Sequence, residues 1–150
     1  DIQFFPPGRR ITGIDISERM LDQARPRAEQ YDGDLELRHL DVHDLDYPKA
    51  TFDQAFTSCT FCSVPDPVDG LRALGRVLKP GGALGMFEHT GSCFFPFSLM
   101  LDLMTPLTRR LGPELNRNTS DNVRRAGFVD VEVEPVYLDV VKIIRARRPD

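Results

Sequence analysis

The sequence predicts an α/β fold built around a mostly parallel β-sheet. Two kinds of segment alternate along the chain. Short segments that are apolar, or in which apolar and polar residues alternate, are typical of strands, and the segments between them are amphipathic with a helical period. Strands that alternate with helices form parallel sheets, because each helix returns the chain to the edge where the next strand begins. The chain has 150 residues, 41% of them hydrophobic, so we expect a single globular domain over residues 1–150.

The first part of the chain predicts two strands with a helix between them. Residues 10–15 (RITGID) form a short strand that ends in a carboxylate. Ser17 is the expected N-cap of a helix over residues 18–31, and Pro26 is expected to kink or end that helix. Residues 35–40 (LELRHL) alternate with period two and predict the second strand.

The middle of the chain predicts a strand, a helix and a strand. Residues 52–58 form the third expected strand, and Asp66 followed by Pro67 marks the start of a helix. The run LKPGG at residues 78–82 predicts a tight turn, because its glycines tolerate a positive φ. Residues 83–87 predict a buried fourth strand.

The last part of the chain predicts helices and then a strand pair. Residues 94–111 are apolar and are expected to be helical. Thr119 is the expected cap of a short helix that stops at Gly127. Two strands in tandem then close the chain as an antiparallel pair, over residues 129–134 and 139–147.

Charge and cysteine content exclude several classes of protein. A net charge of −4 and a pI near 5.4 argue against a protein that binds nucleic acid through bulk electrostatics. Three cysteines are too few for a disulfide framework, which predicts a cytoplasmic protein. The chain also lacks both the apolar core of a signal peptide and a run of ~18 apolar residues that could span a bilayer.

Two acidic residues stand where an α/β sheet binds its ligands, directly after predicted strands. Asp15 ends the first strand and could accept hydrogen bonds from both hydroxyls of a ribose, although a plain loop or cap aspartate is the alternative. Asp41 follows the second strand and could accept from an adenine amino group. The segment DVHDLD could equally be a solvated acidic turn.

The order of motifs along the chain resembles a known family. GIDISERML, LDVHDL, FDQAFTSCTFCSVPDP and LGRVLKPGGALGMFEH follow one another, and LNRNT and RRAGF come later. This order is similar to that of class I methyltransferases that use S-adenosylmethionine, most closely the methyltransferase type 11 or ubiquinone-methylase-like branch and its phospholipid- or thiol-methylating members. The likeness covers residues 10–148 and implies a Rossmann-like sheet with S-adenosylmethionine as cofactor.

The resemblance implies which residues bind the adenosine part of the cofactor. Asp15 would hold the ribose, and Ile16 would pack on the adenine. Asp41 and Val42 would contact the adenine edge.

The same resemblance implies residues near the reacting methyl group. Ser58, Cys59 and Phe61 would line the methionine side of the cofactor. Glu88 and His89 would face the transferred methyl and the substrate, and His89 is the expected base if the acceptor must lose a proton.

One family feature is absent from the chain. The glycine-rich loop that ends the family's first strand should precede Asp15 by about twenty residues, but only DIQFFPPGRRIT and a lone Gly8 lie there. We therefore expect a sheet that lacks the usual first strand and a domain that is incomplete at its N-terminus. Binding of the cofactor by these 150 residues alone stays open at this point.

The cysteines offer a second interpretation. Cys59 and Cys62 have the spacing of metal or redox motifs, and His89 with Cys93 could complete a zinc set. A redox motif of this spacing should open a helix, whereas Ser63-Val64-Pro65 follows here. We therefore predict no metal site.

The expected reaction is methyl transfer to a small or lipophilic acceptor, such as a quinone-like ring, a lipid headgroup or a thiol. The apolar residues 94–111 suit a lipophilic pocket, so polar substitutions at Phe97, Met100 and Met104 should raise KM for the acceptor. Ordinary core, a homodimer contact or a peripheral membrane contact are alternatives for this segment.

Two other functions stay open. A non-catalytic methyltransferase-like binding module fits the missing glycine loop. A nicotinamide-dependent oxidoreductase is less favoured, because no tyrosine–lysine pair lies at a suitable place.

Overall fold

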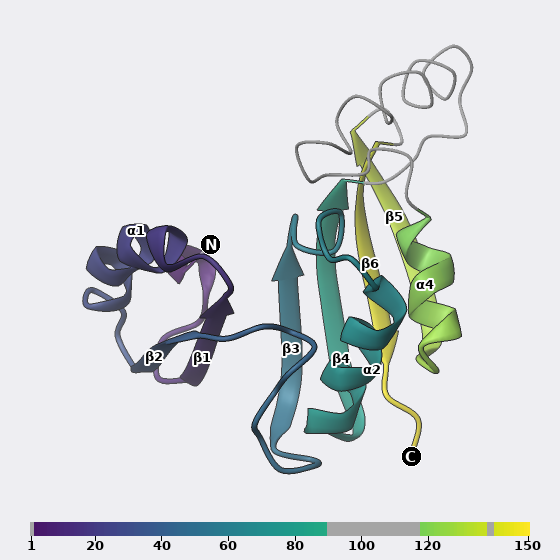
Figure 1. Cartoon of the computed structure of the whole chain (residues 1–150), viewed down its shortest axis with the longest axis horizontal. Coiled ribbons are helices and arrows are strands. Elements are labelled where there is room, and N and C mark those ends of the chain that lie inside the picture. Colours follow the sequence, from purple (N-terminus) through teal and green to yellow (C-terminus); the bar gives the residue numbers. More distant parts are fainter. Residues whose placement is uncertain (1, 90–117, 138–139) are drawn as a thin grey trace. The chain divides into compact units, whose positions relative to one another are not determined.

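The computed structural model describes residues 2–89, 118–137 and 140–150 and contains two compact units, Asp1–Asp46 and Tyr47–Asp150 (Figure 1). Each unit has its own sheet and its own helices. The expectation of a single domain stays a prediction. The expected helix at residues 94–111 and the residue Cys93 lie outside the described residues.

The first unit is a parallel strand pair covered by one helix. After a 3-10 turn at Ile2–Phe4, strand β1 (Arg10–Asp15) leads into helix α1 (Glu18–Ala28), and strand β2 (Asp34–His39) follows. Strands β1 and β2 are parallel, and their last residues, Asp15 and His39, are partners in the register. Helix α1 ends at Ala28, three residues before the end of the expected segment, and Pro26 lies inside its last turn, as expected for an early end near this proline.

In its described part, the second unit has a mixed four-stranded sheet and two helices, and the strand order is β3-β4-β6-β5. Strands β3 and β4 are parallel, whereas β6 is antiparallel to both of its neighbours. The predicted antiparallel pair at the end of the chain is therefore confirmed. The elements of this unit are β3 (Phe52–Ser58), α2 (Pro67–Val77), β4 (Leu78–His89), α4 (Thr119–Arg125), β5 (Val129–Tyr137) and β6 (Val141–Arg147).

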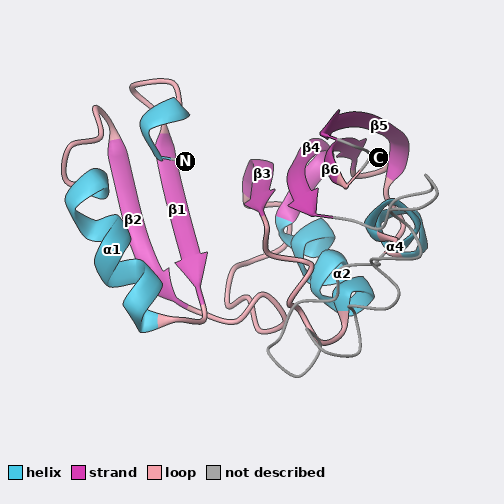
Figure 2. Cartoon of the chain, turned by 90° about the horizontal axis from the view of Figure 1, so that it is seen from above, coloured by secondary structure: helices cyan, strands magenta, loops and turns pink. Residues whose placement is uncertain are grey.

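The core of the second unit lies on one face of its sheet. Side chains alternate along β4, so that Leu84, Met86 and Glu88 are buried on the same face. Figure 2 shows α2 and α4 on a common face of this sheet. The helices contribute buried apolar residues, among them Leu71 and Val123. The polar Glu88 is thus buried among residues that are otherwise almost all apolar.

The connection between α2 and β4 differs from the prediction. No separate turn precedes the strand: β4 starts at Leu78, directly after the helix, and the extra residues form an irregularity in its pairing with β3. Gly81 adopts a φ of +70° there, as expected for the LKPGG run. At Gly82 a Cβ atom would lie 2.7 Å from the carbonyl oxygen of Lys79, so a side chain has no room.

The start of the short helix α4 also differs from the prediction. Asn118 is the N-cap residue, and its Oδ1 accepts a hydrogen bond from the Asp121 N–H at 3.2 Å. Thr119, the predicted cap, is instead the first helical residue and is buried. Gly127 follows the helix with a φ of +99°, as predicted.

None of the helices in the described part of the chain has the length and apolar character that crossing a bilayer demands.

Candidate functional site

The first unit presents two carboxylates at the carboxyl edge of its sheet. Asp15 is the last residue of β1, and Asp41 comes two residues after the end of β2. Because Asp15 and His39 are partners in the parallel register, both carboxylates belong to the same edge. This edge is where parallel α/β sheets bind their ligands. The predicted relation of Asp15 to Asp41 thus agrees with the strand register.

The carboxylate of Asp15 is held by its own turn. Its Oδ1 accepts a hydrogen bond from the backbone N–H of Ser17 at 2.8 Å. Within the described ranges, its Oδ2 has no hydrogen-bond or ion-pair partner. Ser17 occupies the N-cap position of α1, but its hydroxyl makes no capping bond. The turn therefore fixes one carboxylate oxygen of Asp15 and leaves the other for a ligand hydroxyl.

Ile16 and Val42 flank these carboxylates. The Ile16 residue is 67% exposed, which is unusual for a large apolar side chain directly after a strand. Val42 is half-buried next to Asp41. An exposed apolar side chain beside a carboxylate suits a ligand with an aromatic ring and neighbouring hydroxyls.

Asp41 is more fully occupied than Asp15. Its Oδ1 accepts hydrogen bonds from the backbone N–H and from the ring Nδ1 of His43, both at 2.8 Å. The His43 N–H, and then the His43 ring, hold the pKa of the Asp41 carboxyl below its usual value. Oδ1 of Asp41 is therefore engaged within its own turn, in agreement with the interpretation of DVHDLD as an acidic turn.

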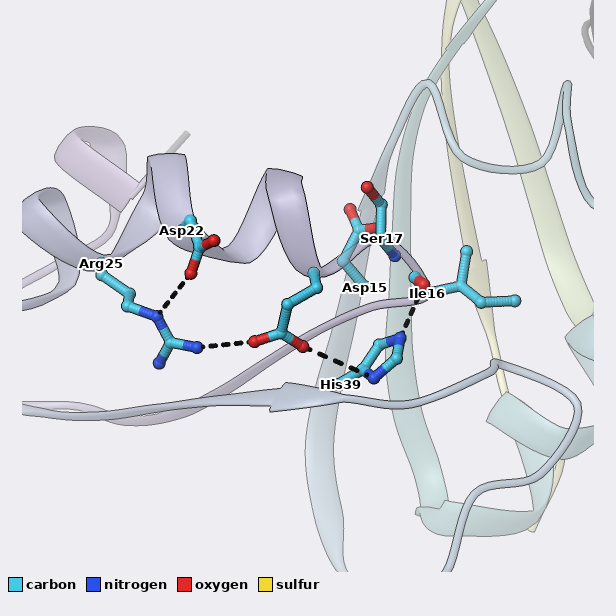
Figure 3. A network of polar contacts seen from close by, with 7 residues as sticks. Asp15, Ile16, Ser17, Asp22, Arg25 and His39 are labelled. Atoms are coloured by element: carbon cyan, nitrogen blue, oxygen red, sulfur yellow. Dashed lines mark hydrogen bonds and ion pairs between the residues drawn. The ribbon is translucent and has the colours of Figure 1, made fainter.

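His39 has two neighbours that its sequence position did not indicate. Its Nε2 lies 2.7 Å from the carbonyl oxygen of Ile16, and its Nδ1 lies 3.5 Å from Oε2 of Glu18 (Figure 3). Glu18 in turn pairs with Arg25 at 3.0 Å. The parallel register, which sets His39 opposite Asp15, is the signal that could have found this contact.

In the second unit, the loop after β3 holds the residues predicted for the methionine side. Ser58 ends β3, and Cys59 follows with a φ of +49°, a left-handed conformation that is uncommon for residues other than glycine. The Cys59 N–H donates to the carbonyl oxygen of Phe87 at 2.8 Å. The Phe61 side chain is completely buried. Phe61 therefore anchors the loop, while Cys59 is exposed.

Glu88 supports this loop from the neighbouring strand. Its Oε1 accepts hydrogen bonds from the Thr57 hydroxyl at 2.9 Å and from the Thr60 N–H at 3.1 Å. The Phe61 N–H donates to Oε2 at 3.2 Å. Burial raises the pKa of Glu88, and the hydrogen bonds from Phe61, Thr57 and Thr60 oppose the rise. All these donors are neutral. They therefore position the carboxyl group of Glu88 but do not balance a negative charge on it with a positive one.

His89 ends β4 next to Glu88 and is half-buried. Its Nδ1 is buried and has no hydrogen-bond partner among the residues that the structure describes.

The zinc set considered from the sequence includes Cys93, which lies outside the described residues. Among the described residues, no group of three or more His, Cys, Asp or Glu side chains could hold a metal ion. The Cys62 thiol is buried and donates to the Cys59 carbonyl oxygen at 3.3 Å, so it is engaged within its own loop.

Comparison with known families decides what the two units are. A family model described as a methyltransferase domain matches residues 3–86, which include β1, β2, β3 and most of β4. The chain belongs to this methyltransferase domain family. The match includes Asp15, Asp41 and the loop after β3.

Named relatives of the methyltransferase domain share part of its length. A demethylmenaquinone methyltransferase of Listeria welshimeri is 36% identical over 83 residues, 55% of this chain and 35% of the relative. A phosphatidylethanolamine N-methyltransferase of Cereibacter sphaeroides is 35% identical over 81 residues, 53% of this chain and 40% of the relative. The chain thus spans well under half the length of these curated relatives.

Solved structures confirm the fold of the methyltransferase domain. The crystal structure of a putative methyltransferase from Bacillus halodurans covers 95% of this chain and 84% of its own, with a TM-score of 0.75 and 13% identity. Other neighbours are named as S-adenosylmethionine-dependent methyltransferases. These neighbours are 20% and 23% identical to this chain, and what they share with it is the fold.

Proposed function

We propose that this chain is the cofactor-binding part of an S-adenosylmethionine-dependent methyltransferase that acts on a small or lipophilic acceptor. One observation carries the proposal. At the carboxyl end of β1, the turn fixes Oδ1 of Asp15, while Oδ2 has no partner in the described part of the chain. The two hydroxyls of a ribose are donors that match such a carboxylate.

The first unit provides the adenosine contacts. Asp15 holds the ribose, and the exposed Ile16 packs against the adenine ring. Asp41 and Val42 meet the adenine edge. Asp41 contributes less to binding than Asp15 does, because Asp41 accepts from a single adenine amino group whereas Asp15 accepts from two ribose hydroxyls.

The second unit provides the contacts near the reacting group. Ser58, Cys59 and Phe61 line the methionine side, and Glu88 contributes by holding their loop. When bound, S-adenosylmethionine supplies a methyl group that its sulfonium charge makes electrophilic. The chain's own task is to align the acceptor and exclude water, and His89 at the end of β4 takes a proton from the acceptor where one must leave.

The acceptor class is proposed from the relatives and the sequence. The names of the relatives give a demethylated menaquinone and phosphatidylethanolamine as acceptors, and both are lipophilic. The apolar composition of residues 94–111 supports the same class. A quinone-like ring, a lipid headgroup and a thiol are the three acceptors to test.

Calorimetry with the full chain tests the proposal. We expect S-adenosylmethionine and its demethylated product, S-adenosylhomocysteine, to bind with one-to-one stoichiometry and NAD not to bind. Binding of NAD alone, or of none of the three, would contradict the proposal. Incubation with a labelled methyl donor and the three acceptor classes then separates an enzyme from a non-catalytic binding module.

A further inference from the structure

We propose that His39 is a positioning residue for the ribose-binding carboxylate and acts on Asp15 through a single peptide group. The inference rests on the proposed function of Asp15. His39 is not among the residues to which the family resemblance assigns a role.

The connection is a series of two hydrogen bonds. Nε2 of His39 lies 2.7 Å from the carbonyl oxygen of Ile16, and the backbone N–H of Ser17 donates to Oδ1 of Asp15 at 2.8 Å. The Ile16 carbonyl and the Ser17 N–H are the two ends of one planar peptide group. Figure 3 shows His39, Ile16, Ser17 and Asp15 gathered at this turn. The orientation of this peptide therefore depends on His39 and in turn sets the Asp15 carboxylate.

The chemistry of the contact fixes which histidine nitrogen acts. A carbonyl oxygen only accepts, so Nε2 must carry the proton and donate. This holds whether or not Nδ1 is also protonated, and Nδ1 faces Glu18. The hydrogen bond from Nε2 to the Ile16 carbonyl oxygen polarises the peptide group. This polarisation strengthens the hydrogen bond that the Ser17 N–H donates to Asp15.

The strand register explains why His39 can reach this peptide. His39 is the register partner of Asp15, and the Leu40 N–H donates to the Asp15 carbonyl oxygen at 3.1 Å. The end of β2 thus holds the end of β1 through its backbone, and the His39 side chain extends this pairing into the turn. No regular ladder bond is available for the Ile16 carbonyl beyond the last strand residue.

Two conservative variants separate the nitrogens. The amide nitrogen of Gln is placed like Nε2, so His39→Gln keeps the donor to Ile16. The amide of Asn reaches only the position of Nδ1, so His39→Asn loses this donor but keeps similar polarity. Glu18→Gln is the matched control for the affinity measurement, because it changes the Nδ1 neighbour and its pair with Arg25 but leaves the Nε2 contact in place. His39 is exposed, so each variant should fold.

The first measurement does not involve the cofactor. In amide NMR spectra of the full chain, the Ser17 resonance should move in His39→Asn and stay near its wild-type position in His39→Gln. An unchanged Ser17 resonance in His39→Asn would overturn the inference even if S-adenosylmethionine binds well.

The second measurement is affinity for S-adenosylhomocysteine by calorimetry. We expect His39→Asn to weaken binding by roughly three- to tenfold, the range of one hydrogen bond, and His39→Gln to stay within about twofold. In an Asp15→Ala background, His39→Asn should have no further effect. Additive effects would show that His39 does not act through Asp15. Absence of binding by the wild type would instead refute the proposed function.

Discussion

The hydroxyl of Thr57 donates a hydrogen bond to the carboxylate of Glu88 at 2.9 Å, and both side chains are buried. Thr57 lies on β3 and Glu88 on the parallel strand β4. The same carboxylate also accepts from backbone N–H groups of Thr60 and Phe61. One buried acid thus links two strand ends to the loop that carries Cys59, and several testable consequences depend on it.

The stability of the chain should depend on pH through Glu88. Burial raises the folded-state pKa of Glu88, so the folded chain binds this proton more tightly than the unfolded chain. The stabilisation of the folded chain by this proton is complete below the usual pKa of a glutamate. It is lost as the pH rises through the raised folded-state pKa of Glu88. Each unit of difference between the folded and unfolded pKa corresponds to about 1.4 kcal/mol.

Glu88→Gln provides the comparison, because glutamine does not titrate. Urea unfolding of both proteins from acidic to neutral pH should show the wild type losing free energy of unfolding relative to Glu88→Gln as the pH rises. A constant difference across the range would mean that Glu88 titrates normally.

The loop after β3 should respond to the loss of the Glu88 carboxylate. Partial desolvation of the thiol, followed by the nearby Glu88 charge, raises the pKa of Cys59, although the residue as a whole is exposed. Glu88→Gln removes the charge but keeps an acceptor for Thr57 and Thr60, so iodoacetamide should label Cys59 somewhat faster. Glu88→Leu also releases the loop N–H groups and should label faster still. Mass spectrometry of the Cys59 peptide measures both rates, and equal rates in all three proteins would contradict the role of Glu88 in this loop.

Asp15→Ala should weaken cofactor binding more than any other single alanine substitution in the chain. Loss of a charge-assisted contact to the ribose should cost about 1.5–3 kcal/mol, or roughly 10- to 150-fold in Kd. Asp41→Ala should be milder, because the adenine ring keeps its apolar packing on the exposed Ile16. Calorimetry checks this order, with Asp22→Ala as a surface control in the same unit. A larger effect of Asp41→Ala would mean that the ribose and adenine contacts are interchanged.

The helix α4 offers a test of its cap. Asn118→Ala removes the acceptor for the Asp121 N–H and should lower the free energy of unfolding by about 1 kcal/mol. Thr119→Val should be neutral or stabilising, because the buried Thr119 hydroxyl has no partner within the described residues. Thermal unfolding of both variants measures the difference. If Thr119→Val destabilised the chain more than Asn118→Ala does, Thr119 would be the N-cap after all.

Local patterns were enough to predict most of the elements. Asp66 and Pro67 predicted the start of α2, and the Asp66 side chain does accept from the Asp69 N–H. Gly127 likewise marked the end of α4. These features depend on neighbours a few residues apart, so the sequence contains them directly.

Features that depend on tertiary contacts were not predicted. The start of β4 at Leu78 depends on its pairing with β3 and on backbone hydrogen bonds between Arg148 and the glycines of LKPGG. The contact of His39 with Ile16, a residue 23 positions earlier in the chain, needs the register of β1 and β2. The role of Glu88 in holding the loop was also not predicted. A carboxylate that accepts hydrogen bonds from a loop cannot be distinguished by sequence alone from one that faces a substrate.

The place of β6 has a consequence for how the chain assembles during translation. Strand β6 is the last strand along the chain but lies between β4 and β5 in the sheet. A nascent chain that has emerged only through β5 has no partner strand for β5, and the edge of β4 is uncovered. Arg148 then closes the unit, since its guanidinium donates to the carbonyl oxygens of Arg76 and Leu78 at the end of α2. The second unit should therefore reach its native sheet only after release of residues 141–148 from the ribosome, and stalled shorter chains should be sensitive to proteases.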